Sequence, residues 1–80
     1  MTHTPVTSST IATVGYDAAT SVLEVRFKPG KKDAALGKPG PLWRYAGVGA
    51  ETHAALLAAE SPGSYFAAEI KGVFEATRVS

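Results

Sequence analysis

Alternation of apolar and polar residues is clearest in the middle of the chain, at Val22–Phe27. Three large apolar residues alternate there with Glu24 and Arg26, which is the period of a strand with one buried face. An earlier run of β-branched and aromatic residues predicts a second strand over Ile11–Tyr16. A bulge near Ala12–Thr13 would bring the large apolar residues of that run to one face. Because the connection between the two strands is too short for a parallel crossover, we expect an antiparallel hairpin.

A third strand is predicted over Leu42–Val48, where the strand-rich and helix-rich halves of the chain meet. It contains the only tryptophan of the protein. Trp43 and Tyr45 are two residues apart and therefore point to the same face of a regular strand, whereas Arg44 points to the other. Two interpretations of the aromatic pair are open at this stage. The rings either stack ligands on an exposed face or pack against the helices that follow.

Helical patterns fill the rest of the chain. The alanine-rich segment Ala50–Glu60 has high helix propensity. Ser61 and Pro62 are typical of a helix start, and the second helix should run to about Lys71. The final stretch, Val73–Val79, is expected to be a tail. The predicted fold class is therefore α+β, with a three-stranded antiparallel sheet followed by two short helices packed on one face (β-β-β-α-α).

Two polar segments interrupt this pattern. Residues 1–8 are rich in threonine and serine and are predicted to form a disordered N-terminal arm, with a single domain over residues 9–80. Residues 28–41 contain three prolines and three glycines, which predicts a long irregular loop with a local charge of +3 in a chain whose net charge is +1. This basic loop either solubilises the protein or contacts an anionic ligand. Its lysines are Lys28, Lys31, Lys32 and Lys38.

Candidate catalytic chemistry is sparse. The chain has no cysteine, and its two histidines, His3 and His53, are fifty residues apart. The carboxylates are scattered, and no phosphate-binding loop has the required spacing. These features argue against an enzyme, and they predict no metal site and no cofactor. With no apolar run long enough to span a bilayer and no signal-peptide pattern, we expect a cytoplasmic protein.

The order of the motifs carries a resemblance to a known family. Ser9–Asp17 and Leu23–Phe27 are followed by the aromatic-x-aromatic strand, then by Ser61–Phe66 and an Ile-Lys pair. This series, which covers about Ser9 to Val79, resembles the KTSC domain. That short domain is found at the C-terminus of some lysyl-tRNA synthetases and as a free-standing bacterial or phage protein.

The resemblance has residue-level implications. The central Tyr-x-Tyr of the family falls on Trp43 and Tyr45, so tryptophan replaces the first tyrosine. The basic loop is also longer than the tight hairpin usual in the family. The other family motifs, Ser-x-Gly-x-Tyr-Phe and Ile-Lys, fall on Ser61, Gly63, Tyr65, Phe66, Ile70 and Lys71. The family has no established activity, but RNA binding has been suggested for it.

Two functions are therefore predicted. The first is a non-catalytic accessory domain that binds RNA or single-stranded nucleic acid, with aromatic rings stacking on bases and cationic side chains holding phosphates. The alternative is a protein-interaction module that uses an open sheet edge or the alanine-rich helix. The residues predicted for nucleic-acid binding are Trp43, Tyr45, Arg44, Arg26, Lys28, Lys31, Lys32, Lys38 and Lys71.

Overall fold

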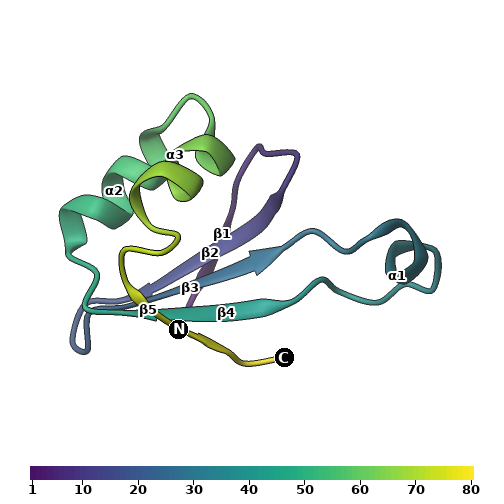
Figure 1. The fold of residues 1–80 in the computed structure, drawn as a ribbon, viewed down its shortest axis with the longest axis horizontal. Coiled ribbons are helices and arrows are strands. Elements are labelled where there is room, and N and C mark those ends of the chain that lie inside the picture. Colours follow the sequence, from purple (N-terminus) through teal and green to yellow (C-terminus); the bar gives the residue numbers. More distant parts are fainter.

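Five antiparallel strands form one sheet in chain order in the computed structural model, which describes residues 1–80. Helices α2 and α3 lie together against one face of this sheet (Figure 1). We call the face toward these helices the core face and the opposite face the outer face. The strands are β1 (His3–Pro5), β2 (Ile11–Asp17), β3 (Val22–Phe27), β4 (Leu42–Ala46) and β5 (Glu75–Arg78), and the helices are α1 (Lys31–Ala35), α2 (Ala50–Ala58) and α3 (Pro62–Glu69).

The predicted three-stranded sheet with two helices is wrong in its element count, although the α+β class holds. The chain adds one short strand at each edge of the sheet, and α1 forms within the basic loop. β1 has only three residues, and all four residues of β5 are exposed. Neither strand carries an apolar alternation that sequence reasoning can detect. Both form because an existing edge offers unpaired backbone groups to a neighbouring segment.

The N-terminal segment was predicted to be a disordered arm, but it contains β1. The imidazole of His3 lies on the outer face and fixes this edge strand to its neighbours. Its Nε2 donates to Glu24 Oε1 at 2.6 Å, and its Nδ1 lies 2.8 Å from Thr13 Oγ1. One imidazole therefore connects the first strand to both β2 and β3.

The central hairpin agrees with the sequence pattern. β2 and β3 pair in antiparallel fashion, and the register shifts between Ile11 and Thr13, so the predicted bulge is confirmed. After the bulge, Tyr16 is on the core face, donates its hydroxyl to the carbonyl of Val48 at 2.7 Å, and stacks on His53 at 4.7 Å. His53 thus packs against the fold.

The core lies between the sheet and the two helices. Nine buried apolar residues form one cluster, to which both helices contribute. α3 starts with Pro62, as predicted, and the chain leaves it through Gly72, whose φ of +77° suits glycine. The cluster consists of Ile11, Val14, Leu23, Val25, Tyr45, Val48, Leu56, Phe66 and Ile70.

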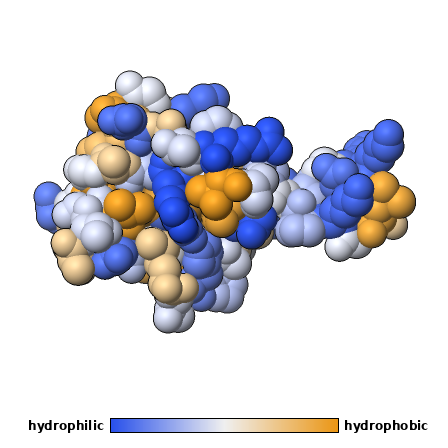
Figure 2. Space-filling model, turned by 90° about the horizontal axis from the view of Figure 1, so that it is seen from below, coloured by the Kyte–Doolittle hydropathy of each residue, from blue (hydrophilic) through white to orange (hydrophobic).

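The basic loop extends away from the body of the molecule (Figure 1). Its surface is mainly hydrophilic, with one apolar patch (Figure 2). Every residue of α1 is exposed. At the base of the loop, the two chain segments approach very closely at buried Gly40. A Cβ there would overlap the carbonyl oxygen of Phe27. Arg26 Nη1 also donates to the Gly40 carbonyl at 2.8 Å, which fixes the base of the loop to β3.

Candidate nucleic-acid interface

Strand register separates the predicted binding residues into two faces. Tyr45 pairs with Leu23 and Trp43 with Val25, so both aromatics lie on the core face. Arg44 pairs with Glu24 on the outer face. The aromatic and the arginine components of the predicted site therefore do not meet.

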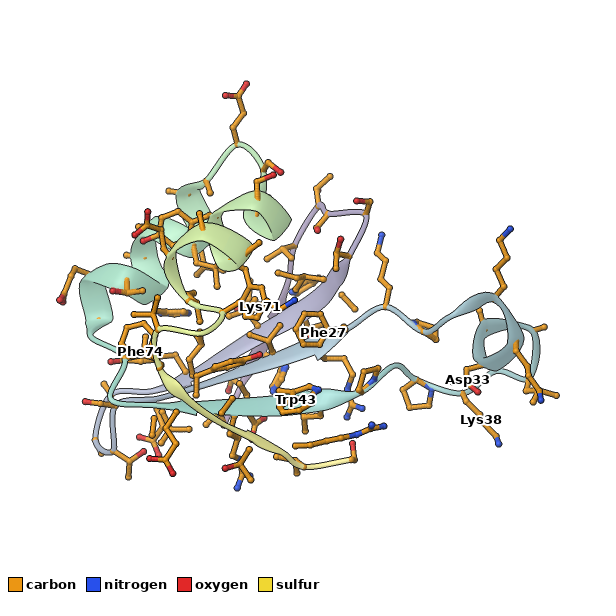
Figure 3. All side chains as sticks on the ribbon, in the orientation of Figure 1. Phe27, Asp33, Lys38, Trp43, Lys71 and Phe74 are labelled. Atoms are coloured by element: carbon orange, nitrogen blue, oxygen red, sulfur yellow. The ribbon has the colours of Figure 1, made fainter.

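An open cavity of about 510 Å³ lies where β3, β4 and β5 pass beneath the end of α3. We call it the aromatic cleft. Figure 3 shows Phe27, Trp43 and Lys71 gathered in this region. Three predicted site residues, Trp43, Tyr45 and Lys71, contribute to its walls. The full lining is Thr10, Phe27, Trp43, Tyr45, Gly63, Phe66, Ala67, Lys71, Gly72 and Ala76.

The aromatic rings of the cleft differ in accessibility. Tyr45 and Phe66 are each only 5% exposed and belong to the core, whereas Phe27 and Trp43 are half-buried. Phe66 contacts the rings of Phe27 and Tyr45 edge-to-face, with both centroid distances at 5.3 Å. This packing holds the rings in place. Tyr45 therefore packs in the core, whereas Trp43 packs against the core cluster and keeps part of its surface accessible.

The hydroxyl of Tyr45 is a polar group inside this apolar site. It has no hydrogen-bond partner within the protein, although it is not sealed from solvent. Tyr45 lines the aromatic cleft. Burial raises the pKa of Tyr45, which keeps the phenol protonated at neutral pH. The cleft therefore offers a hydroxyl that can donate to a ligand.

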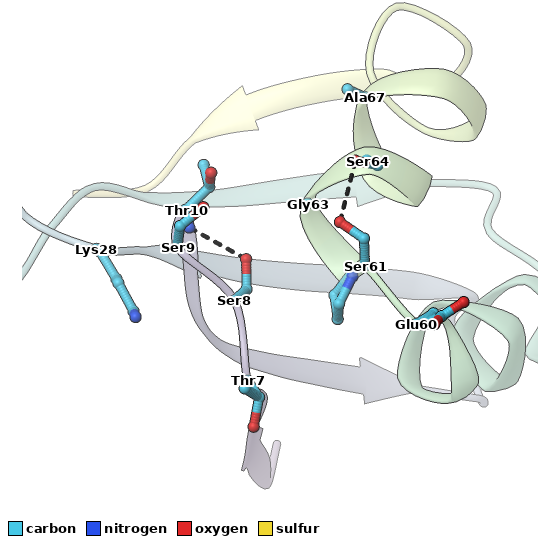
Figure 4. A pocket seen from close by; sticks show the side chains of 11 residues that line it. Thr7, Ser8, Ser9, Thr10, Lys28, Glu60, Ser61, Gly63, Ser64 and Ala67 are labelled. Atoms are coloured by element: carbon cyan, nitrogen blue, oxygen red, sulfur yellow. Dashed lines mark hydrogen bonds between the residues drawn. The ribbon is translucent and has the colours of Figure 1, made fainter.

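A second cavity of about 570 Å³ adjoins the cleft and is predominantly polar. We call it the hydroxyl pocket (Figure 4). Ser8 Oγ accepts from the backbone N–H groups of Thr10 and Ile11, and Ser61 Oγ donates to Ser64 Oγ at 3.0 Å. Lys28 supplies a positive charge at one side. The full lining is Thr7, Ser8, Ser9, Thr10, Lys28, Glu60, Ser61, Pro62, Gly63, Ser64 and Ala67.

On the outer face, Arg44 and Arg26 have structural partners. Arg44 Nε donates to Glu24 Oε2 at 2.6 Å, and the other carboxylate oxygen accepts from His3. Burial favours a higher pKa for Glu24, but the hydrogen bonds and positive charge of these two partners outweigh it and lower the pKa. Arg26 donates to the Gly40 carbonyl and, at 3.3 Å, to Ser80 Oγ. These two arginines hold strands and a loop together.

The predicted lysines lie in three places. Lys71 lines the aromatic cleft, and Lys28 lines the hydroxyl pocket. The remaining three, Lys31, Lys32 and Lys38, are exposed on the basic loop and line neither cavity.

Sequence reasoning missed two residues near the cleft. Phe27 was assigned to the core through its alternation, and the alternation cannot show that one side of its ring is accessible. Arg78 lies directly opposite Trp43 in the β4–β5 ladder and therefore on the core face. No signal could have placed Arg78, because β5 itself had no detectable pattern.

Two further properties of the fold concern metal-binding clusters and membrane-spanning helices. No group of three or more histidine, aspartate or glutamate side chains is placed to hold a metal ion. None of the helices has the length and apolar character needed to cross a lipid bilayer.

Comparisons with known proteins identify the family. Residues 7–74 match the KTSC domain, and the chain belongs to this family of small α+β domains. The crystal structure of a KTSC domain protein from Yersinia pestis is similar, with a TM-score of 0.83 and 30% sequence identity over 99% of this chain and 97% of that one. No curated protein matches the sequence. The resemblance inferred from the motif order is therefore confirmed.

Proposed function

We propose that this protein is a non-catalytic, cytoplasmic domain that binds RNA or single-stranded nucleic acid through the aromatic cleft. The observation that carries the proposal is the combination of half-buried Trp43, accessible Phe27 and the unpartnered Tyr45 hydroxyl in one open cavity. Burying the apolar walls of such a cavity is favourable, whether a side chain of the protein or a bound ligand covers them. An aromatic cavity that stays open is therefore suited to receive a flat ligand.

Base stacking supplies the affinity in this proposal. A base on an aromatic side chain contributes about 1–3 kcal/mol, and it does so with little sequence preference because every base has a π face. Only Trp43 and Phe27 have accessible ring surface here. We therefore expect one or two stacked bases.

Backbone phosphates supply the salt dependence. Lys71 lines the cleft, Arg78 lies beside Trp43, and Lys28 lies in the adjoining hydroxyl pocket. If these three side chains neutralise three phosphates of a single strand, the log–log salt slope is about −2, and affinity falls about twentyfold between about 50 and 200 mM salt.

Trp43 fluorescence tests the proposal, because this residue is the only tryptophan. We expect single-stranded RNA to quench its emission at low salt, with recovery as salt is added. In a parallel anisotropy assay with labelled RNA, Trp43→Leu should weaken binding about tenfold, in line with the loss of one stacked base. Arg44→Gln removes a charge from the outer face of the same strand and is the matched control, with an expected change under about twofold.

Absence of quenching at low salt, together with equal RNA affinity for Trp43→Leu and the parent protein, would refute the nucleic-acid proposal.

One observation favours the alternative, a protein partner. The edge strand β5 is exposed along its whole length, and its Ala76 lines the cleft. An extended peptide added to β5 could therefore place a side chain in the cleft. Such a complex would rest on backbone hydrogen bonds and apolar contact, so its affinity would change little with salt, whereas nucleic-acid binding follows the slope given above.

A further inference from the structure

The aromatic cleft and the hydroxyl pocket share one wall. Three residues line both cavities: Thr10, which immediately precedes β2, and the small residues Gly63 and Ala67 from α3. At Gly63, a Cβ would lie 3.3 Å from Ser8 Oγ and 3.5 Å from Thr10 Oγ1. The junction of the two cavities therefore lies at Gly63, where α3 is close to Ser8 and Thr10 and no side chain occupies the space.

The chemistry changes sharply across this junction. Six of the ten residues around the aromatic cleft are hydrophobic, against one of the eleven around the hydroxyl pocket. The hydrogen bonds within the pocket involve Ser8, Ser61 and Ser64, and the side chains of Thr7, Ser9 and Thr10 have no protein partner. One ligand that filled both cavities would need a flat apolar part joined by a short link to a part rich in hydrogen-bond acceptors.

A nucleotide unit has this composition, since only a sugar separates its base from its phosphate. We propose that the two cavities hold one nucleotide unit of a single strand, with the base in the aromatic cleft and its phosphodiester in the hydroxyl pocket. This inference rests on the proposed function, because it assumes that the cleft receives a base. The Tyr45 hydroxyl would then face the edge of the base, while Lys28 and the free hydroxyls would donate to the phosphate oxygens.

The charge of the pocket selects the form of the phosphate. Lys28 and Glu60 are the only charged residues in the lining, and their formal charges cancel. A pocket without net positive charge favours a phosphodiester with one negative charge over a terminal phosphate that is close to doubly charged at neutral pH. The expected ligand is therefore an internal position of a strand and not a free mononucleotide.

NMR titration with small probes tests this placement on the intact protein. Uridine should shift the indole N–H signal of Trp43 and leave the amides of the hydroxyl pocket unchanged. The dinucleoside monophosphate UpU should shift the indole signal and, in addition, the amides of Ser9 and Ser64. If UpU shifts the indole signal but leaves the pocket amides unmoved, the phosphate lies elsewhere and the inference is wrong.

Variants provide an independent test with labelled single-stranded RNA of about ten nucleotides, a length that small single-strand-binding domains cover. Gly63→Val should obstruct the junction and weaken binding at least tenfold. The double variant Ser61→Ala/Ser64→Ala, which changes only exposed hydroxyls, should weaken binding about threefold without changing the salt slope. Lys28→Gln should reduce the slope by about 0.7. Thr20→Ala, in the exposed β2–β3 turn at the other end of the hairpin, is the control and should bind like the parent.

The outcomes separate the two proposals. If Trp43→Leu weakens binding while the serine variant and Lys28→Gln match the parent, the inference is overturned and the proposed function stands. If the parent protein does not bind RNA at low salt, the proposed function fails and this inference fails with it.

Discussion

On the outer face of the sheet, the buried carboxylate of Glu24 links β3 to β1 and β4. Glu24 is 6% exposed and accepts hydrogen bonds from a residue of β1 and a residue of β4. Sequence alternation correctly placed Glu24 away from the apolar face, but it did not predict that this side chain is buried. This burial arises because β1 extends the sheet beside β2 and places the His3 side chain against Glu24 on the outer face, which the polar N-terminal sequence did not predict.

The partners of Glu24 give it a pH-dependent effect on stability. Because its pKa is lowered from the ordinary value of 4.5, the ionised form is favoured in the folded state. Its contribution to the free energy of unfolding is complete above pH 4.5 and is lost as the pH falls through the lower folded-state pKa. We expect Glu24→Gln to destabilise the protein by about 2 kcal/mol at about pH 7 and by less at about pH 3, as measured by urea unfolding.

Glu75→Gln on the exposed strand β5 is the control for this experiment, with an expected change within about 0.5 kcal/mol. An equal destabilisation by Glu24→Gln at both pH values would contradict the assignment, since it would mean that the charge of the carboxylate has no stabilising role.

The central elements of the fold could be predicted because their sequences repeat with the period of the structure. Leu23, Val25 and Phe27 alternate as the strand requires, and Ser61-Pro62 begins α3 where expected. β1, α1 and β5 could not be predicted in this way. Their residues bury little apolar surface, so their positions depend on backbone pairing and on the rest of the fold. The site was predicted in part for the same reason, because Trp43 and Tyr45 belong to a periodic strand and Arg78 does not.

The base of the basic loop offers a test at the level of an element. Gly40→Ala would place a methyl group against the backbone of Phe27 and Lys28, which cannot move without disturbing the end of β3. We expect a destabilisation of about 2 kcal/mol in urea unfolding, typical of overpacking. Gly30→Ala is a matched control, since a Cβ there meets no atom within 4 Å and φ is −65°. Its effect should stay within about 0.5 kcal/mol, and an equal effect of both variants would refute the close approach at Gly40.

Charge is unevenly distributed over the whole molecule. The basic loop carries a formal charge of +3 and the rest of the chain −2, although the net charge is only +1. The net charge alone therefore understates the local electrostatic field around the basic loop. A polyanion approaching the molecule would be attracted to the loop and repelled by much of the body, so the loop should orient the encounter.

Neutralising the loop lysines tests this effect on association. The triple variant Lys31→Gln, Lys32→Gln and Lys38→Gln changes only exposed side chains outside both cavities. In stopped-flow measurements of Trp43 quenching, we expect the association rate with single-stranded RNA to fall several-fold at low salt and the dissociation rate to stay nearly constant. The difference should vanish at high salt. A faster dissociation with an unchanged association rate would instead indicate direct contacts between these lysines and the bound strand.

The close approach of the two loop ends at Gly40 also affects how far the length of the loop can vary. Since the two ends of the loop are fixed to each other by Arg26 and by the Phe27 N–H bond to the Pro41 carbonyl, the entropy of closing the loop is offset at its base. Residues of the loop between these two fixed ends can then be added or removed at little cost in stability, because the entropy of loop closure changes only slowly with loop length. The tip of the loop is accordingly a natural place for insertions, and a practical one for grafting a peptide or opening the chain by circular permutation.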